Sequence, residues 1–124
     1  MALTTIADAA SYDVDGYTFR PLAVPSRGTK ELAIWHLEAH PGASSTPHHH
    51  DREVIFVVKT GAMAGTVGDQ DVHAGPGDAI IVPGETMFSL RNASTTEPAT
   101  LTVVATVGMQ AILDGNVITP PWTV

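Results

Sequence analysis

The sequence predicts an all-β fold, a sandwich or barrel formed by a single domain. The chain has 124 residues, which is enough for one domain with a modest core. About ten short runs rich in β-branched and aromatic residues are separated by Gly and Pro, which favour turns. No helical period extends beyond a turn or two, and no repeat or linker divides the chain. Short strands joined by turns are typical of β-sandwiches and barrels.

The N-terminal third is expected to contain an arm and two strands. Residues 1–16 have little apolar pattern, so we expect an arm that could pack on a neighbouring copy. Residues 17–24 are expected to form a strand that ends at Pro25. Residues 30–39 predict a second strand with two different faces. Its apolar face carries Ala33, Trp35, Leu37 and Ala39, and its mixed face carries Leu32, Ile34, His36, Glu38 and His40.

The rest of the chain predicts a meander of short strands. Residues 54–58 form the most strongly β-biased run, and we expect them to be buried on both faces. Residues 86–91 alternate cleanly, so Phe88 is expected inside. Further strands are expected at residues 61–67, 70–74, 78–82, 99–107 and 108–113. The body of the domain would then span residues 17–113, followed by a tail at 114–124.

Composition excludes several classes of partner and chemistry. The chain has 13 acidic and 6 basic residues, and its net charge of −7 argues against binding to nucleic acid or an anionic membrane. It has no cysteine, which excludes disulfides, thiolate metal sites and a thiol nucleophile. The N-terminus lacks a signal-peptide pattern, and no run approaches the length of a membrane span. We therefore expect a cytoplasmic protein.

Three adjacent histidines lie between a polar loop and the strongest β-run. In an extended chain, side chains alternate between faces, so His48 and His50 point the same way and His49 points the opposite way. Two neutral imidazoles on one face can chelate a divalent transition metal such as Fe, Mn, Ni, Zn or Cu. The alternative is a solvated loop whose histidines bind nothing.

Glu53 is the candidate third ligand of this metal. With His48 and His50 it would form a two-His, one-carboxylate triad, which leaves positions open for a substrate and dioxygen or water. Glu53 is also a candidate to shuttle a proton. It lies an odd number of residues from both histidines, so it would face away unless a bulge re-aims it. The alternative is a surface acid paired with Arg52.

Residues 42–61 resemble the first motif of the cupin family. That motif is glycine, five residues, His, any residue, His, three or four residues, Glu, six residues, glycine. The matching positions are Gly42, His48, His50 and Gly61. Val54 occupies the strict slot of the family's carboxylate, and Glu53 precedes it by one position.

Residues 77–92 resemble the second cupin motif, which is glycine, five residues, Pro, any residue, Gly, two residues, His, three residues, Asn. The matching positions are Gly77, Pro83 and Asn92. Phe88 stands in the slot of the histidine, and Glu85 replaces the inner glycine. The Pro-Pro-Trp sequence at residues 120–122 is similar to the end of small single-domain bacterial cupins. The resemblance implies a cupin jelly roll and metal-dependent dioxygenase, isomerase, lyase or cyclase chemistry.

Other polar residues are additional candidates for the site. His36 or His40 would join the metal if the mixed face of the second strand lined the interior, and His49 would join it in an irregular loop. His73 is expected at the surface. Glu85 is a candidate ligand or general base, and its alternative is a solvent-exposed turn residue.

The aromatic residues Trp35, Phe56 and Phe88 are expected in the core or in the wall of the pocket. An aromatic ring in a ligand slot would favour an apolar or aromatic substrate. Two functions follow: a metal-dependent enzyme acting on a small organic molecule, or a metal-free cupin that binds or senses such a molecule. In either case we expect a homodimer, formed by strand pairing or by exchange of the N-terminal arm.

Overall fold

The computed structural model describes residues 2–124, and its regular structure in that range is β-strand with three short 3₁₀ segments. The strands are β1 Tyr12–Val14, β2 Tyr17–Ala23, β3 Leu32–Ala39, β4 His49–His50, β5 Val54–Thr60, β6 Met63–Val67, β7 Gln70–Ala74, β8 Ala79–Val82, β9 Phe88–Asn92, β10 Ala99–Thr106, β11 Ala111–Leu113 and β12 Asn116–Ile118. The 3₁₀ segments are η1 Ile6–Asp8, η2 Pro25–Arg27 and η3 Pro121–Thr123. The predicted all-β class is confirmed. No helix within residues 2–124 has the length and apolar character needed to span a bilayer.

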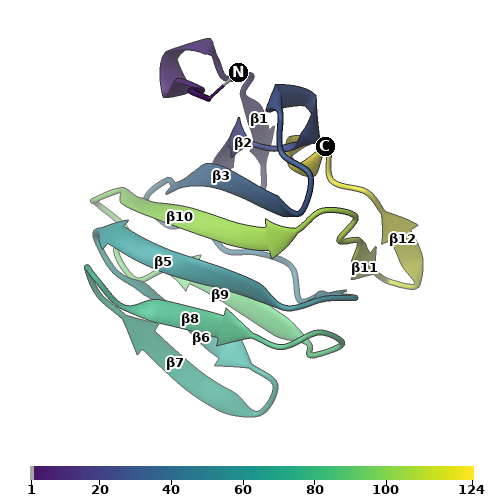
Figure 1. Cartoon of the computed structure of the whole chain (residues 1–124). Coiled ribbons are helices and arrows are strands. Elements are labelled where there is room, and N and C mark those ends of the chain that lie inside the picture. Colours follow the sequence, from purple (N-terminus) through teal and green to yellow (C-terminus); the bar gives the residue numbers. More distant parts are fainter. Residues whose placement is uncertain (1) are drawn as a thin grey trace.

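The strands form a sandwich-like arrangement of antiparallel sheets that does not close into a barrel (Figure 1). The large sheet has six strands in the order β1-β2-β3-β10-β5-β8. A three-stranded sheet, β7-β6-β9, forms the second layer, and another, β12-β11-β4, lies at one end. Because β4 belongs to this end sheet, the histidine loop is fixed by pairing of His49 and His50 with β11.

The core lies between the large sheet and the β7-β6-β9 sheet. On β3, β5 and β10 every second side chain is buried, as the period of a strand requires. Trp35, Val103 and Phe56 are cross-strand neighbours on this inner face. Phe88 and Leu90 of β9 are buried in the same cluster. The apolar face of residues 30–39 is therefore the inner one, and the mixed face, which was the alternative, lies outside.

The prediction that residues 54–58 are buried on both faces is wrong. Val54, Phe56 and Val58 are buried, whereas Ile55 and Val57 are only half-buried. The run is continuously apolar because its outer face is apolar as well, although no other layer of this chain covers that face among the described residues.

Both ends of the chain are more ordered than an arm and a tail. Within the predicted arm, β1 pairs with β2 at the edge of the large sheet; Met1 lies outside the described residues. Within the predicted tail, β12 pairs with β11, and η3 follows it. Trp122 of η3 stacks on Phe19 of β2 with ring centroids 3.8 Å apart. The two ends of the chain therefore pack on the same part of the large sheet.

Candidate functional site

A cavity of about 640 Å³ lies between the sheets. Its walls are mainly apolar and aromatic, and they come from both layers and from the two ends of the chain. The aromatic side chains Trp35, Phe56 and Phe88, which the sequence placed in the core or in a pocket wall, line it. His48 and His50 line the same cavity. The remaining candidate ligands and bases lie elsewhere.

His48 and His50 enter the cavity because the chain is extended on either side of His49. His48 forms an antiparallel bridge with Phe88, and His50 pairs with Ala111. The two imidazole centroids are 5.1 Å apart and their planes are nearly perpendicular, at 80°. The two histidines therefore lie on the same face, as the alternation of side chains in an extended chain predicts.

The hydrogen bond of His48 fixes its tautomer. Its Nδ1 lies 2.8 Å from the carbonyl oxygen of Thr46. A carbonyl only accepts, so Nδ1 carries the hydrogen and donates it. In the neutral ring, Nε2 then holds a free lone pair, which can accept a proton or bind an electrophile.

His50 is a buried, neutral imidazole. Only 7% of the residue is exposed. Burial, followed by the neighbouring charge of His48, lowers the pKa of His50 to about 4. Its Nδ1 is buried without a hydrogen-bond partner, although buried polar groups are normally satisfied. His50 therefore presents a polar group that the protein itself does not use.

Phe88 packs against both imidazoles. Its ring centroid is 4.6 Å from that of His48 and 5.2 Å from that of His50. It also lies 5.8 Å from the ring of Phe56. The histidine slot of the second motif thus contributes an apolar wall beside the pair rather than a third nitrogen.

The predicted triad with Glu53 is not assembled. Glu53 is exposed and does not line the cavity, whereas Val54 is fully buried. No bulge re-aims Glu53, since the alternation of β5 begins at the buried Val54. Among residues 2–124 there is no group of three or more His, Asp or Glu side chains placed to hold a metal ion. The donors present supply two nitrogens, one fewer than the three protein ligands of a catalytic zinc site, so a metal held here would need a further ligand from outside the protein.

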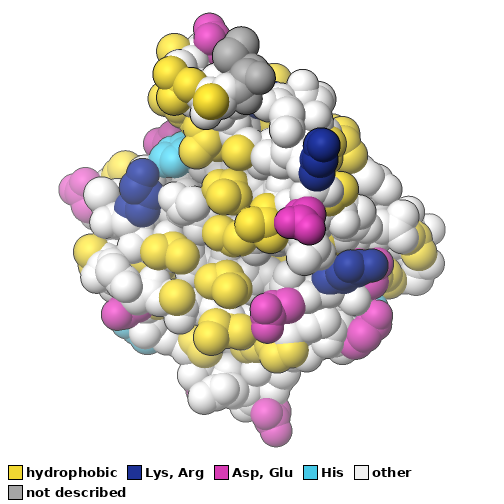
Figure 2. All heavy atoms as spheres, in the orientation of Figure 1, with side chains coloured by type: hydrophobic (Ala, Val, Ile, Leu, Met, Phe, Trp, Pro, Cys, Tyr) yellow, Lys and Arg dark blue, Asp and Glu magenta, His cyan; other side chains and the backbone are white. Residues whose placement is uncertain are grey.

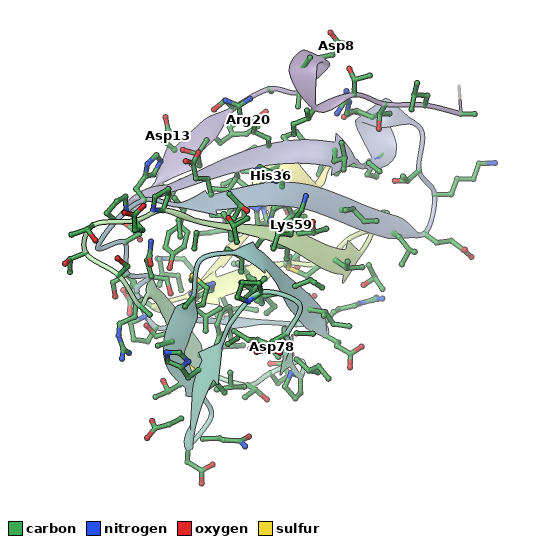
Figure 3. All side chains as sticks on the ribbon, turned by 90° about the vertical axis from the view of Figure 1, so that its left-hand side faces the viewer. Asp8, Asp13, Arg20, His36, Lys59 and Asp78 are labelled. Atoms are coloured by element: carbon green, nitrogen blue, oxygen red, sulfur yellow. The ribbon has the colours of Figure 1, made fainter. Side chains whose placement is uncertain are left out.

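The other candidates point away from the cavity. His36 is half-buried on the outer side of β3, where burial and then Lys59 lower its pKa (Figure 3). The exposed His40 donates from Nε2 to the hydroxyl of Thr18, 2.8 Å away, which in turn donates to Asp13. His36 and His40 belong to the mixed face of residues 30–39. That face would have carried them into the cavity only if it had lined the interior.

His49, Glu85 and His73 lie outside the cavity as well. His49 Nε2 lies 3.5 Å from Glu85 Oε2, and the side chain of Glu85 is 69% exposed. Glu85 has a positive φ of 61°, which suits the turn position where the second motif that this segment resembles has glycine. His73 is exposed on β7, as expected. Neither Glu85 nor His49 is in a position to act in the cavity.

The sequence did not indicate that the ends of the chain wall the cavity. Tyr12 of β1 and Trp122 of η3 line it, with ring centroids 6.2 Å apart. Pro120 and Pro121 line it as well. The available signal was the isolated Trp122 after two prolines, because a large aromatic side chain is seldom left in solvent.

The buried hydroxyl of Tyr17 is already engaged. It donates to the carbonyl oxygen of Leu90 at 2.7 Å. Burial and the nearby Asp15 raise the pKa of Tyr17 above its usual range, so the hydroxyl keeps its proton. Among the described residues of the wall, two buried polar atoms have no hydrogen-bond partner, Nδ1 of His50 and Nε1 of Trp35.

The chain is similar to known proteins over most of its length. The model of the cupin domain family matches residues 35–105. No curated protein matches the chain. Among solved structures, the polyketide cyclase RemF from Streptomyces resistomycificus superposes with a TM-score of 0.75 at 24% identity, covering 86% of this chain and 79% of that one.

Two further structures show the same likeness. KdgF from Halomonas sp. gives a TM-score of 0.72 at 22% identity and covers 86% of this chain and 93% of its own. An RmlC-like cupin from Shewanella frigidimarina gives a TM-score of 0.73 at 16% identity, and the match covers 86% of this chain and 90% of that one. At these identities the likeness shows the fold alone.

Proposed function

The chain belongs to the cupin domain family, and we propose that it is a small-molecule enzyme whose cavity takes a largely apolar organic molecule containing one or more rings. The observation that carries this proposal is the contrast inside the cavity. Its wall is mainly apolar and aromatic, yet the imidazoles of His48 and His50 line it as well. Such a combination suits a ligand with an apolar body and one polar group.

The size of the cavity supports a ligand of this kind. Its volume of about 640 Å³ lies within the range of about 300 to 1,000 Å³ that is typical of small-molecule sites. Trp35, Phe56 and Phe88 offer ring faces and edges against which a flat ligand can pack. A hydroxyl or carbonyl on that ligand would be directed to the two imidazoles.

The histidine pair supports proton-transfer chemistry. The Nε2 lone pair of His48 can accept a proton, and its Nδ1–H bond to Thr46 then stabilises the imidazolium. His50 stays neutral near pH 7 because its pKa lies about 4. It can therefore orient the ligand oxygen without competing for the proton. Isomerase, lyase or cyclase reactions that move a proton beside a carbonyl or phenol fit this division of roles.

The test compares two flat probes that differ in one polar group, naphthalene and 2-naphthol. Trp35 and Trp122 line the cavity, so quenching of intrinsic fluorescence reports binding. We expect 2-naphthol to bind about 3 to 10 times more tightly, the gain of about one hydrogen bond. His48→Ala should remove this preference, and His73→Ala, which changes an exposed histidine, should keep it.

The proposal is wrong if the hydroxyl gives no advantage in the wild type, or if His48→Ala and His73→Ala behave alike. Activity on enolisable or phenolic substrates should follow the same pattern, with loss in the His48 variant only.

A second candidate is a cupin enzyme that uses a divalent transition metal held by His48 and His50. It is favoured by the tautomer of His48, which leaves Nε2 free as a ligand, and by the position of His50 beside it in the cavity wall, with the two ring centroids 5.1 Å apart. Such an ion would act as a Lewis acid toward a substrate oxygen. The naphthol experiment separates the two candidates: a preference that EDTA abolishes and zinc restores would favour the metal, and one that EDTA leaves intact would favour the imidazoles alone.

A further inference from the structure

Aromatic rings gather at one end of the cavity, where the two ends of the chain meet (Figure 1). Tyr12 of β1 is the cross-strand neighbour of Phe19 of β2, and Trp122 of η3 stacks on Phe19. The ring centroids of Tyr12 and Trp122 are 6.2 Å apart, as are those of Tyr17 and Phe19. All four residues line the cavity, and we call them the aromatic end.

The aromatic end is more open than the part of the cavity beside the histidine pair. Tyr12, Phe19 and Trp122 are half-buried, whereas Phe88, which packs against both imidazoles, is only 3% exposed. A half-buried ring keeps part of its surface free of protein neighbours. The aromatic end therefore offers ring surface to a ligand in addition to closing the core.

An acidic side chain lies next to the aromatic end. Asp15 lines the same cavity, and with Gly16 it forms the two-residue turn between β1 and β2. The two residues have positive φ values of 53° and 82°, as in the type I′ turn of a tight hairpin. The backbone N–H of His40 donates to the carbonyl oxygen of Gly16 at 3.0 Å, which holds the turn in place. Within residues 2–124 no basic side chain forms a salt bridge with Asp15.

Asp13 lines the cavity as well, but its carboxylate is engaged on the other side of the sheet. It accepts a hydrogen bond from the hydroxyl of Thr18 at 2.6 Å. Thr18 and Phe19 are successive residues of β2, so their side chains point to opposite faces. Asp15 is therefore the acid that is free to meet a charged ligand at this end.

The wall of the cavity has no basic side chain to oppose Asp15. Among the described residues, those that line the cavity include no Lys or Arg. Figure 2 shows Lys and Arg side chains on the outer surface of the molecule, separated from one another. Asp15 also adds to the effect of burial in raising the pKa of Tyr17, so its negative charge acts on the wall. The electrostatics of this end disfavour an anion and favour a cation.

We propose that the aromatic end is a binding site for a methylated ammonium group, with Asp15 as its counter-ion. This inference rests on the proposed function, because it names the ligand of the same cavity as an organic cation with an apolar body. Cations are attracted to the faces of aromatic rings within about 6 Å of the ring centroid. The rings of Tyr12 and Trp122, inclined at 54° with centroids 6.2 Å apart, leave room for one group within that distance of both.

The two ends of the cavity would then bind different parts of one molecule. The apolar body packs against Trp35 and Phe56, and an oxygen of the ligand faces the imidazoles. A methylated ammonium suits half-buried rings, because its charge is spread over methyl groups that need no hydrogen-bond partner. A carboxylate in its place would lose hydration without gaining a basic partner in the wall.

The test compares phenyltrimethylammonium with tert-butylbenzene, which has the same shape and no charge. Binding to the full chain is followed by intrinsic fluorescence, since Trp122 belongs to the aromatic end. We expect the wild type to bind the cation about ten times more tightly. Asp15→Asn should reduce this preference to about threefold, and asparagine tolerates a positive φ. Asp69→Asn removes the same charge from the exposed turn between β6 and β7 and should keep the preference.

Two substitutions of Tyr12 separate the ring from its hydroxyl. Tyr12→Leu should reduce the preference for the cation by about threefold, whereas Tyr12→Phe should keep it, because the ring face remains. Circular dichroism checks that each variant is folded. Equal affinity of the wild type for the two probes would overturn the proposal, and so would the same preference in the Asp15 and Asp69 variants.

Failure of this inference can be distinguished from failure of the proposed function. The advantage of 2-naphthol over naphthalene depends on His48, at the other end of the cavity, and does not involve a cation. If that advantage is present while the two new probes bind equally, the ammonium site is wrong and the proposed function stands. If no probe binds, both are wrong.

Discussion

The large sheet presents two apolar faces, and only one of them is covered by the chain itself. Along β10, Leu101 and Val103 point inward and are fully buried, whereas Thr102 and Val104 point outward and are half-buried. The inner face meets β7-β6-β9 and encloses the cavity. The outer face meets no other layer among the described residues.

The two faces differ in the polar groups they carry, and these groups determine which kind of partner each apolar surface suits. Two imidazoles from the end of the chain's histidine loop are directed to the inner face, and one of them has a nitrogen without a partner. The central rows of the outer face carry no formal charge and no buried polar orphan. An enclosed apolar surface with a polar point suits a small molecule, and a flat one without it suits another protein surface.

Leu101→Ala should produce the largest effect on stability and tests how strongly the inner face is packed. Leu101 has no exposed area, so the variant loses its buried side chain and leaves a cavity. We expect the free energy of unfolding to fall by about 4 kcal/mol, measured by urea denaturation. Thr102→Ala, its outward neighbour, should cost less than about 1 kcal/mol. Equal losses would mean that the two faces are packed alike.

Acid should destabilise the inner face through His50. Its pKa is lowered from 6.5 to about 4 in the folded protein, so the unfolded chain binds a proton that the native state rejects. Stability should therefore fall from pH 6.5 toward pH 4, and this residue should contribute about 3 kcal/mol of the loss. Above pH 6.5 the ring is neutral in both the folded and the unfolded state, so His50 no longer makes stability depend on pH.

Urea denaturation of the wild type and His50→Gln across this pH range checks the contribution of His50. The difference in free energy of unfolding between the wild type and the variant should narrow as the pH falls, because the variant has no imidazole to protonate. His73→Gln removes an exposed imidazole and is the matched control. Parallel curves for the wild type and His50→Gln would contradict the predicted burial of a neutral ring.

Phe88→His should give the smallest energetic effect of the three changes. It tests whether the histidine pair on the inner face is placed to share a metal ion. The new imidazole would lie beside His48 and His50, whose ring centroids are 4.6 and 5.2 Å from that of Phe88. Three nitrogen ligands suit zinc better than two. We expect zinc affinity to rise at least about tenfold, or about 1.4 kcal/mol, measured by calorimetry. Phe56→His is the control, and an equal gain there would mean that the pair is not positioned to share an ion.

Much of the fold was predictable because its signals are local. Alternation separated the apolar and mixed faces of β3 and predicted the inward position of Phe88. Gly61 and Gly77, found by motif spacing, adopt positive φ values of 77° and 89°. A Cβ at Gly61 would also lie 2.8 Å from Ala99, which explains a glycine at this turn. The same alternation placed His48 and His50 on one face before any pairing was known.

The rest of the site depended on contacts between distant segments. Parity raised the doubt about Glu53, but only the pairing of β5 shows that Val54 occupies the inner position. The contribution of Tyr12 and Trp122 arises because both ends of the chain pack near β2.

By itself, the sequence determined the all-β class, the family and the direction of the two imidazoles, since each follows from spacing along a few neighbouring residues. The tertiary structure decided that the metal-type triad is not assembled, that the chain ends wall the cavity and that one apolar face of the large sheet is left uncovered. The physical reason is that a strand's period of two assigns residues to opposite faces, whereas the packing of distant segments decides what each face contacts.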